Sequence, residues 1–194
     1  MFALDGKLTF INIEQDYIKK LNSACPEVYY KSRGYESKPY IGILVSNDNK
    51  KYVIPLSSAK EKHKKWKNVD RDRYLVYEMA EKSSMGENDI WVEIDSNMVK
   101  HILSVLDIKK MIPIIDGVYK RVNINLEESD TSEMKKYKAL LNKEYTFCLK
   151  IIDQVIEKAN KLYDRQMKSG KVIKFCCDFK ALELIADKEL RSSK

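Results

Sequence analysis

Two serines, a lysine and a run of cations follow a proline near the first third of the chain. Residues 56–68 read L-S-S-A-K-E-K-H-K-K-W-K-N and come directly after Pro55. Hydroxyls and lysines bind phosphate oxygens, cations stabilise a developing oxyanion, and an indole ring offers a surface for base stacking. These groups could hold one phosphodiester for in-line cleavage. In an alternative interpretation, Ser57 and Ser58 cap a solvated helix that begins near Lys60, and this role is compatible with anion binding.

A second set of polar residues stands at the start of a predicted buried strand. Its members are Tyr35, Lys38 and Tyr40. The strand, Tyr40–Val45, leads through the turn residues 47–49 into a second strand, Lys51–Ile54, which we expect Pro55 to end. If the two strands pair antiparallel, Lys38 and the two serines lie at the same end of the hairpin.

Other catalytic signatures are missing from the sequence. It contains no glycine-rich phosphate loop, no G-x-S-x-G and no H-E-x-x-H. There are only two histidines, and His101 lies in the apolar segment V-K-H-I-L-S-V-L, where a hydrogen-bonded structural role is the better interpretation. We expect no metal site among the carboxylates, and no cofactor.

Length and composition predict one globular domain over residues 1–194. Apolar residues make up 44% of the chain and charged residues 34%, which excludes a disordered chain. The longest uncharged apolar stretch, Met111–Ile115, is far too short to span a membrane, and residues 1–10 lack a secretory signal, so we expect a cytoplasmic protein. We expect the four cysteines to be reduced, structural thiols.

The positive charge is concentrated in one segment. Residues 31–74 hold twelve Lys/Arg and five Asp/Glu, whereas the rest of the chain holds 24 of each sign. A local cationic excess is typical of a protein that binds a phosphate polymer, because phosphate neutralisation releases counterions. A solvated lysine-rich loop is the alternative interpretation.

The distribution of glycine and proline predicts an α+β fold. All four prolines precede residue 118, and residues 118–169 contain neither Gly nor Pro, so strands and turns should come first and helices second. A strand is predicted over Leu8–Ile13 and a short helix over Glu14–Leu21. The remaining predicted strands are Arg73–Tyr77, Ile90–Ile94, a stretch within His101–Leu106, Met111–Ile115 and Arg121–Ile124.

The last third has helical periodicity. Apolar residues recur at spacings of three and four from Met134 to Leu162. We expect a helix from Ser132 to about Leu141 that bends into a longer one ending near Gly170, and a final helix over Phe179–Leu190.

These blocks resemble the ToxN/AbiQ family of endoribonuclease toxins of type III toxin–antitoxin systems, whose antitoxin is an RNA. The resemblance lies in K-P-Y-I-G-I-L-V (Lys38–Val45), K-Y-V-I-P-L-S-S-x-K (Lys51–Lys60) with the K-H-K-K that follows, M-I-P-I (Met111–Ile114) and the lysine-rich helical tail. It implies a strongly twisted antiparallel sheet with helices packed around it, akin to that of the MazF/Kid toxins. It also implies metal-independent cleavage of cellular and phage RNA to 2′,3′-cyclic phosphate and 5′-hydroxyl ends, and a role in abortive infection.

The resemblance also implies roles for individual residues. The catalytic set it implies is Lys38, Ser57, Ser58, Lys60 and Tyr35, with Tyr30 as the alternative site tyrosine. With the basic segment added, the RNA contacts are Tyr17, Arg33, Tyr40, Lys62, His63, Lys64, Lys65 and Lys67. Ala59 stands where many relatives carry proline.

The implied partner is an RNA pseudoknot encoded as tandem repeats, which forms a cyclic protein–RNA hetero-oligomer with the toxin. Two rival hypotheses use the same basic segment. One is a non-catalytic RNA-binding or translation-associated module. The other is a DNA-directed nuclease, which is disfavoured because DNA has no 2′-hydroxyl.

Overall fold

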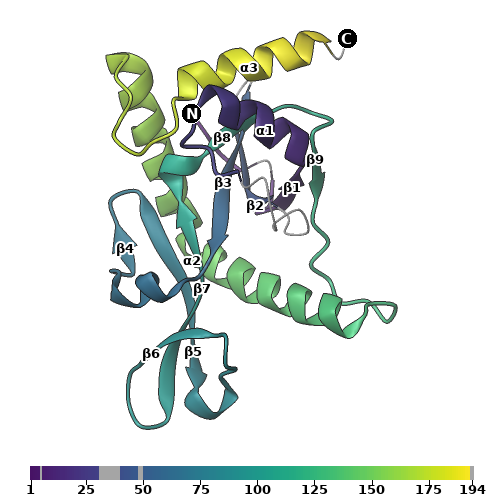
Figure 1. Cartoon of the computed structure of the whole chain (residues 1–194), viewed down its shortest axis with the longest axis vertical. Helices are drawn as coiled ribbons and strands as arrows, with labels where there is room; N and C mark the ends of the chain where they lie inside the picture. The colour runs from purple at the N-terminus through teal and green to yellow at the C-terminus, as the bar shows by residue number, and fades with distance from the viewer. Residues whose placement is uncertain (5, 31–39, 48–49, 193–194) are drawn as a thin grey trace. The chain divides into compact units, whose positions relative to one another are not determined.

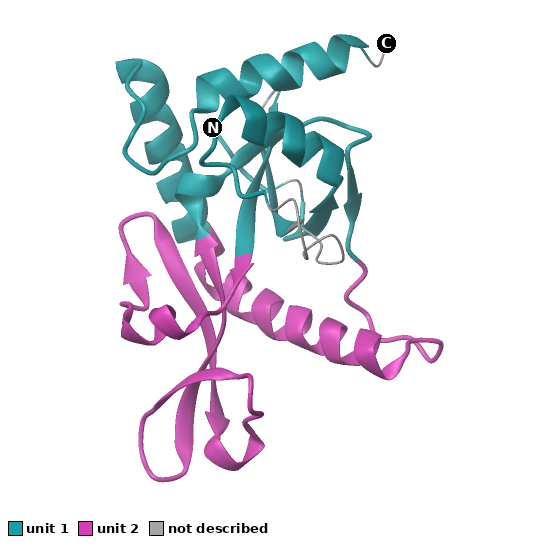
Figure 2. Ribbon diagram, in the orientation of Figure 1, with its two compact units in different colours: residues 1–56, 107–122, 153–194 teal, residues 57–106, 123–152 magenta. Residues whose placement is uncertain are grey.

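The computed structural model describes residues 1–4, 6–30, 40–47 and 50–192, and the side chain of Tyr40 lies outside that description. The contacts divide the chain into two compact units, shown in Figure 2. Unit 1 comprises residues 1–56, 107–122 and 153–194, and unit 2 comprises residues 57–106 and 123–152. Neither unit is one continuous stretch of sequence. The single domain over residues 1–194 stays a prediction.

Unit 1 contains an antiparallel sheet in the order β8-β3-β2-β1-β9 (Figure 1). Its strands are β1 (Phe10–Ile13), β2 (Tyr40–Asn47), β3 (Lys50–Ser58), β8 (Ile112–Ile114) and β9 (Tyr119–Arg121). β1 buries Phe10, Ile11 and Ile13, so the short strand has little polar surface. It lies between β2 and β9, and Asn12 is its one exposed residue.

The β2–β3 hairpin has the predicted antiparallel arrangement, with Gly42 opposite Pro55. A Cβ atom on Gly42 would lie 2.5 Å from the carbonyl oxygen of Ile54, so only glycine allows the two backbones to approach this closely. The predicted end of the second strand at Pro55 is wrong, because β3 continues to Ser58. Proline removes one ladder donor but keeps an extended φ, and the N–H of Ala59 beyond it donates to the carbonyl of Leu103 at 3.3 Å.

Helices complete unit 1. Helix α1 (Gln15–Ala24) buries Tyr17, Ile18 and Leu21 on one face. Helix α3 (Phe179–Ser192) packs against α1 and β8, as Figure 1 shows. The C-terminal part of α2 (Ser132–Ser169) also belongs to this unit.

One buried carboxylate joins α3 to the sheet and to α2. Glu183 of α3 is 6% exposed, and its Oε1 accepts hydrogen bonds from Tyr52 Oη at 2.8 Å and Tyr163 Oη at 2.7 Å. Lys50 forms an ion pair with Oε2 of the same side chain. Because both oxygens have partners, the burial of this charge is compensated.

Unit 2 contains the antiparallel strands β4 (Val69–Asp70), β5 (Arg73–Glu81), β7 and β6 (Ile90–Glu93), paired in that order. β7 (Met98–Asp107) lies in unit 2 up to Leu106. Leu75, Ile102 and Val105 form a small core, and Ala59, Trp66, Tyr77, Ile90 and Val92 pack against it. The short helices of the chain are η1 (Glu61–Lys65), η2 (Lys82–Ser84) and η3 (Ile108–Lys110), the last of which is in unit 1.

The predicted α+β class is confirmed, with antiparallel strand pairs and a helical last third. Two boundaries differ from the predictions. α2 is one helix of 38 residues rather than two, because no breaker interrupts it before Gly170, which adopts φ +64° at its end. β9 ends at Arg121, where the prediction had it begin. Across the described residues, no helix combines the length and the apolar character needed to cross a bilayer.

Candidate functional site

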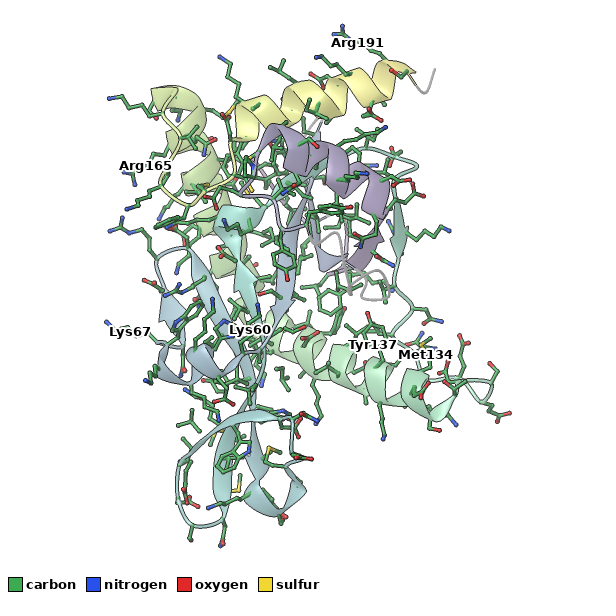
Figure 3. The ribbon with its side chains drawn as sticks, viewed as in Figure 1. Lys60, Lys67, Met134, Tyr137, Arg165 and Arg191 are labelled. Atoms are coloured by element: carbon green, nitrogen blue, oxygen red, sulfur yellow. The ribbon has the colours of Figure 1, made fainter. Side chains whose placement is uncertain are left out.

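The two predicted hydroxyls lie at the end of β3 with their side chains exposed. Ser57 and Ser58 are the last two residues of the strand, and both belong to unit 2. Lys60, also exposed, is the residue before η1 and serves as its N-cap (Figure 3). The interpretation that the serines cap a helix is therefore wrong. Their hydroxyls stand on an extended backbone, in which consecutive side chains point to opposite faces.

His63 anchors the turn between Lys60 and η1. Its side chain is 3% exposed, and Nδ1 accepts the backbone N–H of Lys60 at 3.0 Å. The pKa of His63 is lowered from 6.5 to about 4, chiefly by burial and then by the charges of Lys62, Lys60 and Arg73, in that order. The imidazole is therefore neutral at neutral pH and carries its proton on Nε2. Its burial gives His63 a positioning role and argues against direct contact with RNA.

Two cations contact the ring of Trp66. The Cζ atom of Arg73 lies 3.7 Å from the ring centroid, and Lys62 Nζ lies 5.4 Å from it. His63 packs against the same ring at 4.4 Å between centroids. Arg73 also pairs with Asp70 at 3.0 Å. The indole therefore fixes two cations beside η1, and the contacts of Arg73 and His63 with its ring limit its use as a surface for base stacking.

The other lysines of the basic segment include both neutralised and exposed cations. Lys64 pairs with Glu61 at 2.9 Å and lies 6.0 Å from the ring centroid of Trp91. Lys62, Lys65 and Lys67 are exposed, and within the described part of the chain they pair with no carboxylate. Charge is also separated along unit 2, because residues 57–77 hold seven Lys/Arg and three Asp/Glu, whereas residues 78–95 hold one and six. This separation of charge favours binding of a polyanion on the η1 side of the unit rather than at residues 78–95.

His101 has the structural role that the sequence predicts. Its Nδ1 lies 3.0 Å from Glu78 Oε1, and its Nε2 lies 3.6 Å from Asp89 Oδ1. Lys143 of α2 reaches the same Glu78 oxygen at 2.7 Å. All four cysteines are free and buried, as predicted. Among the described residues, no three His, Cys, Asp or Glu side chains are grouped to hold a metal ion.

Several predicted residues lie elsewhere or outside the description. Tyr17 is 3% exposed, and its hydroxyl donates to the carbonyl of Pro113 at 3.0 Å. Burial, followed by the charges of Glu189 and Asp187, raises the pKa of Tyr17. RNA binding by Tyr17 stays a prediction that its burial does not favour. The predicted residues outside the described part of the chain are Arg33, Tyr35, Lys38 and the side chain of Tyr40.

The sequence analysis missed two residues of unit 2. One is Arg73, whose stacking on Trp66 could not be inferred from a strand-forming pattern. The other is Glu144 of α2, which is buried, so that desolvation raises its pKa to about 7 while Ser104 partly offsets the shift. Its only signal in the sequence is a glutamate between Leu141 and Cys148 on the apolar face of a helix.

This is a small α+β protein in which exposed hydroxyls and a lysine at a strand end, beside a run of cations, have the chemistry to hold a phosphodiester. A comparison with protein families identifies one family. Residues 9–187 match the family described as Toxin ToxN, type III toxin–antitoxin system, and the chain belongs to this family.

Two curated relatives match nearly the whole chain. Endoribonuclease ToxN of Bacillus thuringiensis subsp. kurstaki is 27% identical over 181 residues, which cover 90% of this chain and 80% of the relative. Endoribonuclease AbiQ of Lactococcus lactis subsp. lactis is 25% identical over 182 residues, with 91% and 86% covered.

Solved structures have the same fold. One is from a study of selective toxin inhibition by a non-coding RNA pseudoknot in bacterial type III toxin–antitoxin systems. It has a TM-score of 0.68 at 23% identity and covers 94% of this chain and 98% of its own. The structure of AbiQ, an anti-phage endoribonuclease, has a TM-score of 0.65 at 24% identity, with 97% and 100% covered. At these identities the likeness shows the fold alone.

Proposed function

We propose that this chain cleaves RNA without a metal ion and is inhibited by an RNA. As a member of the ToxN family it is an endoribonuclease toxin of a type III toxin–antitoxin system. One observation carries the proposal: the exposed Ser57 and Ser58 end a strand immediately before Lys60, and a buried neutral His63 holds the turn that carries Lys60. The relatives' names support RNA as the substrate.

In the proposed mechanism, the ribose 2′-hydroxyl beside the scissile phosphate attacks phosphorus. The bond from O2′ to phosphorus forms while the bond from phosphorus to O5′ breaks, and the products carry a 2′,3′-cyclic phosphate and a 5′-hydroxyl. A base takes the 2′-hydroxyl proton and an acid returns a proton to O5′. The enzyme forms no covalent intermediate.

The residues divide this work between them. Ser58 donates a hydrogen bond to a non-bridging oxygen. Ser57, on the opposite face of the extended backbone, enters the proposal on the family resemblance alone. Lys60 and Lys38 serve as oxyanion stabiliser and base, and Tyr35 is the proton donor. Lys38 and Tyr35 enter the proposal on the sequence argument alone. Arg73, missed by the sequence analysis, adds charge beside Lys62, whereas His63 fixes the backbone and stays neutral.

Cleavage in the presence of a chelator tests the chemistry. Purified protein should cut single-stranded RNA in excess EDTA, and polynucleotide kinase should label the 5′ ends of the products without prior dephosphorylation. An absolute requirement for magnesium would contradict the mechanism. RNA binding without any cleavage would favour the non-catalytic module instead.

Alanine variants test the site. Ser58→Ala, Lys60→Ala and Lys38→Ala should each relieve growth inhibition on induced expression. The melting temperatures of Ser58→Ala and Lys60→Ala should stay close to that of the wild type, because both residues are exposed and exposed polar substitutions usually cost less than about 0.5 kcal/mol. Ser96→Ala and Lys82→Ala are matched controls, since both residues are exposed in or beside the acidic stretch of residues 78–95, and both variants should remain toxic. Site variants that remain toxic, or that lose toxicity only by unfolding, would overturn the assignment.

The proposed inhibitor is an RNA pseudoknot transcribed from tandem repeats, retained with the toxin in a closed ring of alternating protein and RNA. A structural neighbour from a study of selective toxin inhibition by a non-coding RNA pseudoknot supports this choice. Co-expression with the upstream repeats should neutralise toxicity without a second protein, and the purified complex should absorb strongly at 260 nm. Charge reversal at Lys62, Lys64 and Lys65 should weaken RNA binding and flatten its salt dependence. Neutralisation by a small protein, with no nucleic acid bound, would refute the antitoxin assignment.

A further inference from the structure

The loop between α2 and α3 presents an aromatic ring on an unusual backbone. Phe175 has φ +62° and is the one non-glycine residue of the described part of the chain with a positive φ. A bulky L-residue meets a steric penalty in this left-handed conformation. Its ring is nevertheless 62% exposed, so burial of the ring does not compensate for the penalty. Strain of this kind is typical of sites that clamp a ligand.

A rigid frame imposes the conformation of Phe175. The N–H of Cys176 donates to the carbonyl of Ile173, and the N–H of Cys177 donates to the carbonyl of Lys109, both at 2.9 Å. The buried Gln166 of α2 donates from Nε2 to the carbonyl of Cys177 at 3.0 Å and accepts the N–H of Phe179 at 2.7 Å. The backbone that carries the ring is therefore fixed, and a partner that contacts the ring does not have to order this loop.

The surroundings of the ring are cationic. Residues 161–180 hold six Lys/Arg and two Asp. Asp164 is paired with Lys168 at 3.3 Å. The ammonium of Lys174 lies 5.0 Å from the centroid of the Phe175 ring. Arg165 extends from α2 in the same unit (Figure 3).

We propose that Phe175 is a stacking platform for an unpaired RNA base, with Lys174 and Lys171 contacting the phosphates beside it. An aromatic ring flanked by cations is the combination that binds single-stranded nucleic acid, because bases stack on the ring while cations bind the backbone. A protein partner would need a contiguous apolar surface, whereas the exposed apolar neighbour in this loop is the single side chain of Val172. The proposal rests on the proposed function for RNA as the partner, but it uses none of the residues assigned to cleavage.

Three variants separate stacking from folding. Phe175→Asn removes the ring and places a residue that tolerates positive φ, so the melting temperature should stay unchanged or rise. Phe175→Trp keeps a ring for stacking. Val172→Ala is the matched control, because Val172 is 50% exposed in the same loop.

The probe is a fluorescein-labelled single-stranded RNA of about 12 nucleotides, whose 2′-O-methyl groups block cleavage. In fluorescence anisotropy, Phe175→Asn should bind it about 5- to 150-fold more weakly, the loss expected for one stacked base. Phe175→Trp and Val172→Ala should stay within about twofold of the wild type. The slope of affinity against salt should be unchanged in Phe175→Asn, because a ring displaces no counterions, and should fall by about one in Lys174→Ala.

Two further assays identify the source of the base. If Phe175 contacts substrate, Phe175→Asn raises the KM for RNA cleavage. If it contacts the inhibitor, cleavage is unchanged and the upstream repeat RNA no longer neutralises growth inhibition. Either result supports the platform.

The inference is overturned by unchanged affinity in Phe175→Asn, by an equal loss in Val172→Ala, or by equal dependence of a fully paired RNA duplex on Phe175. Wild-type protein that binds vesicles of anionic phospholipid but no RNA would also overturn it. Normal cleavage in EDTA with no effect of Phe175→Asn on affinity would reject the platform and leave the proposed function intact. RNA binding through Phe175 with no cleavage would support the platform and reject the proposed function.

Discussion

Acidification should destabilise the turn that carries Lys60, because the neutral state of His63 holds it. Folding lowers the pKa of His63 from 6.5 to about 4, so the unfolded chain binds its proton more readily than the folded protein. This contribution to stability is present above pH 6.5 and is lost as the pH falls toward 4. Protonation converts Nδ1 from an acceptor to a donor facing the N–H of Lys60, and it adds a charge beside Lys62 and Arg73.

The size of the effect follows from the pKa difference. One pKa unit is worth about 1.4 kcal/mol, so the full difference corresponds to about 3 kcal/mol. Because solvent screens the neighbouring exposed cations, we expect about 1–2 kcal/mol. For a chain of this length, that is a fall in melting temperature of about 2–8 °C between about pH 7.5 and about pH 4.5.

Thermal unfolding of a matched variant isolates the effect. His63→Asn keeps an acceptor oxygen near the position of Nδ1 but cannot titrate. As the pH falls, the melting temperature of the wild type should therefore fall relative to that of the variant. His63→Leu removes the acceptor and should cost about 1–3 kcal/mol near neutral pH, because the N–H of Lys60 is left without its partner. This cost should shrink as the pH falls, because leucine does not titrate. His63→Leu should also reduce cleavage, whereas His63→Asn should retain it. A pH-independent difference between wild type and His63→Asn would refute this reasoning.

Three further predictions concern stability. Gly42→Ala should destabilise the chain by more than about 2 kcal/mol in urea unfolding, because the added Cβ meets backbone atoms of β3 that cannot move aside; a loss below about 0.5 kcal/mol would show that the hairpin can relax. Glu144→Gln should be neutral near pH 4.5 and stabilising by about 2–3 kcal/mol above pH 7, because burial raises the pKa of this carboxyl and stability is lost as the pH rises through it; a difference that does not change with pH would contradict the assignment. Glu183→Ala should cost about 2–4 kcal/mol in the same assay, because it leaves the hydroxyls of Tyr52 and Tyr163 without their acceptor, and Leu184→Ala, at an exposed neighbour on α3, is its control.

The elements near the proposed site were largely predictable, because their signals are local. A buried apolar strand followed by a polar turn predicted the β2–β3 hairpin, and its antiparallel pairing is confirmed. The end of β3 was not predictable from Pro55, because the partner that keeps the chain extended, Leu103 of β7, lies more than forty residues further along the sequence. The rule that proline ends a strand accounts for the missing N–H donor. It does not account for the hydrogen bond to Leu103, which keeps the chain extended beyond Pro55.

The chemistry of individual side chains was less accessible. His63 stands among four lysines and reads as one more exposed polar residue, yet it is buried against Trp66. Arg73 is the third residue after Asp70 and only the fold brings its guanidinium onto the indole. The positive φ of Phe175 could not be predicted, because phenylalanine disfavours this backbone conformation and nothing in the sequence indicates it.

The arrangement of charge in unit 2 explains why the segment before β5 needs a neutral anchor. Lys60, Lys62 and Arg73 all lower the pKa of His63, so they lie close enough to repel one another. Carboxylates offset two cations of this segment, through Glu61 on Lys64 and Asp70 on Arg73, and the π system of Trp66 stabilises two. Among the described residues no carboxylate pairs with Lys60 or Lys62, and a bound phosphate would reduce the repulsion between these cations. The free protein therefore holds its cations in a conformation whose electrostatic cost is recovered when a polyanion binds, and a histidine that stays uncharged keeps that cost from rising further.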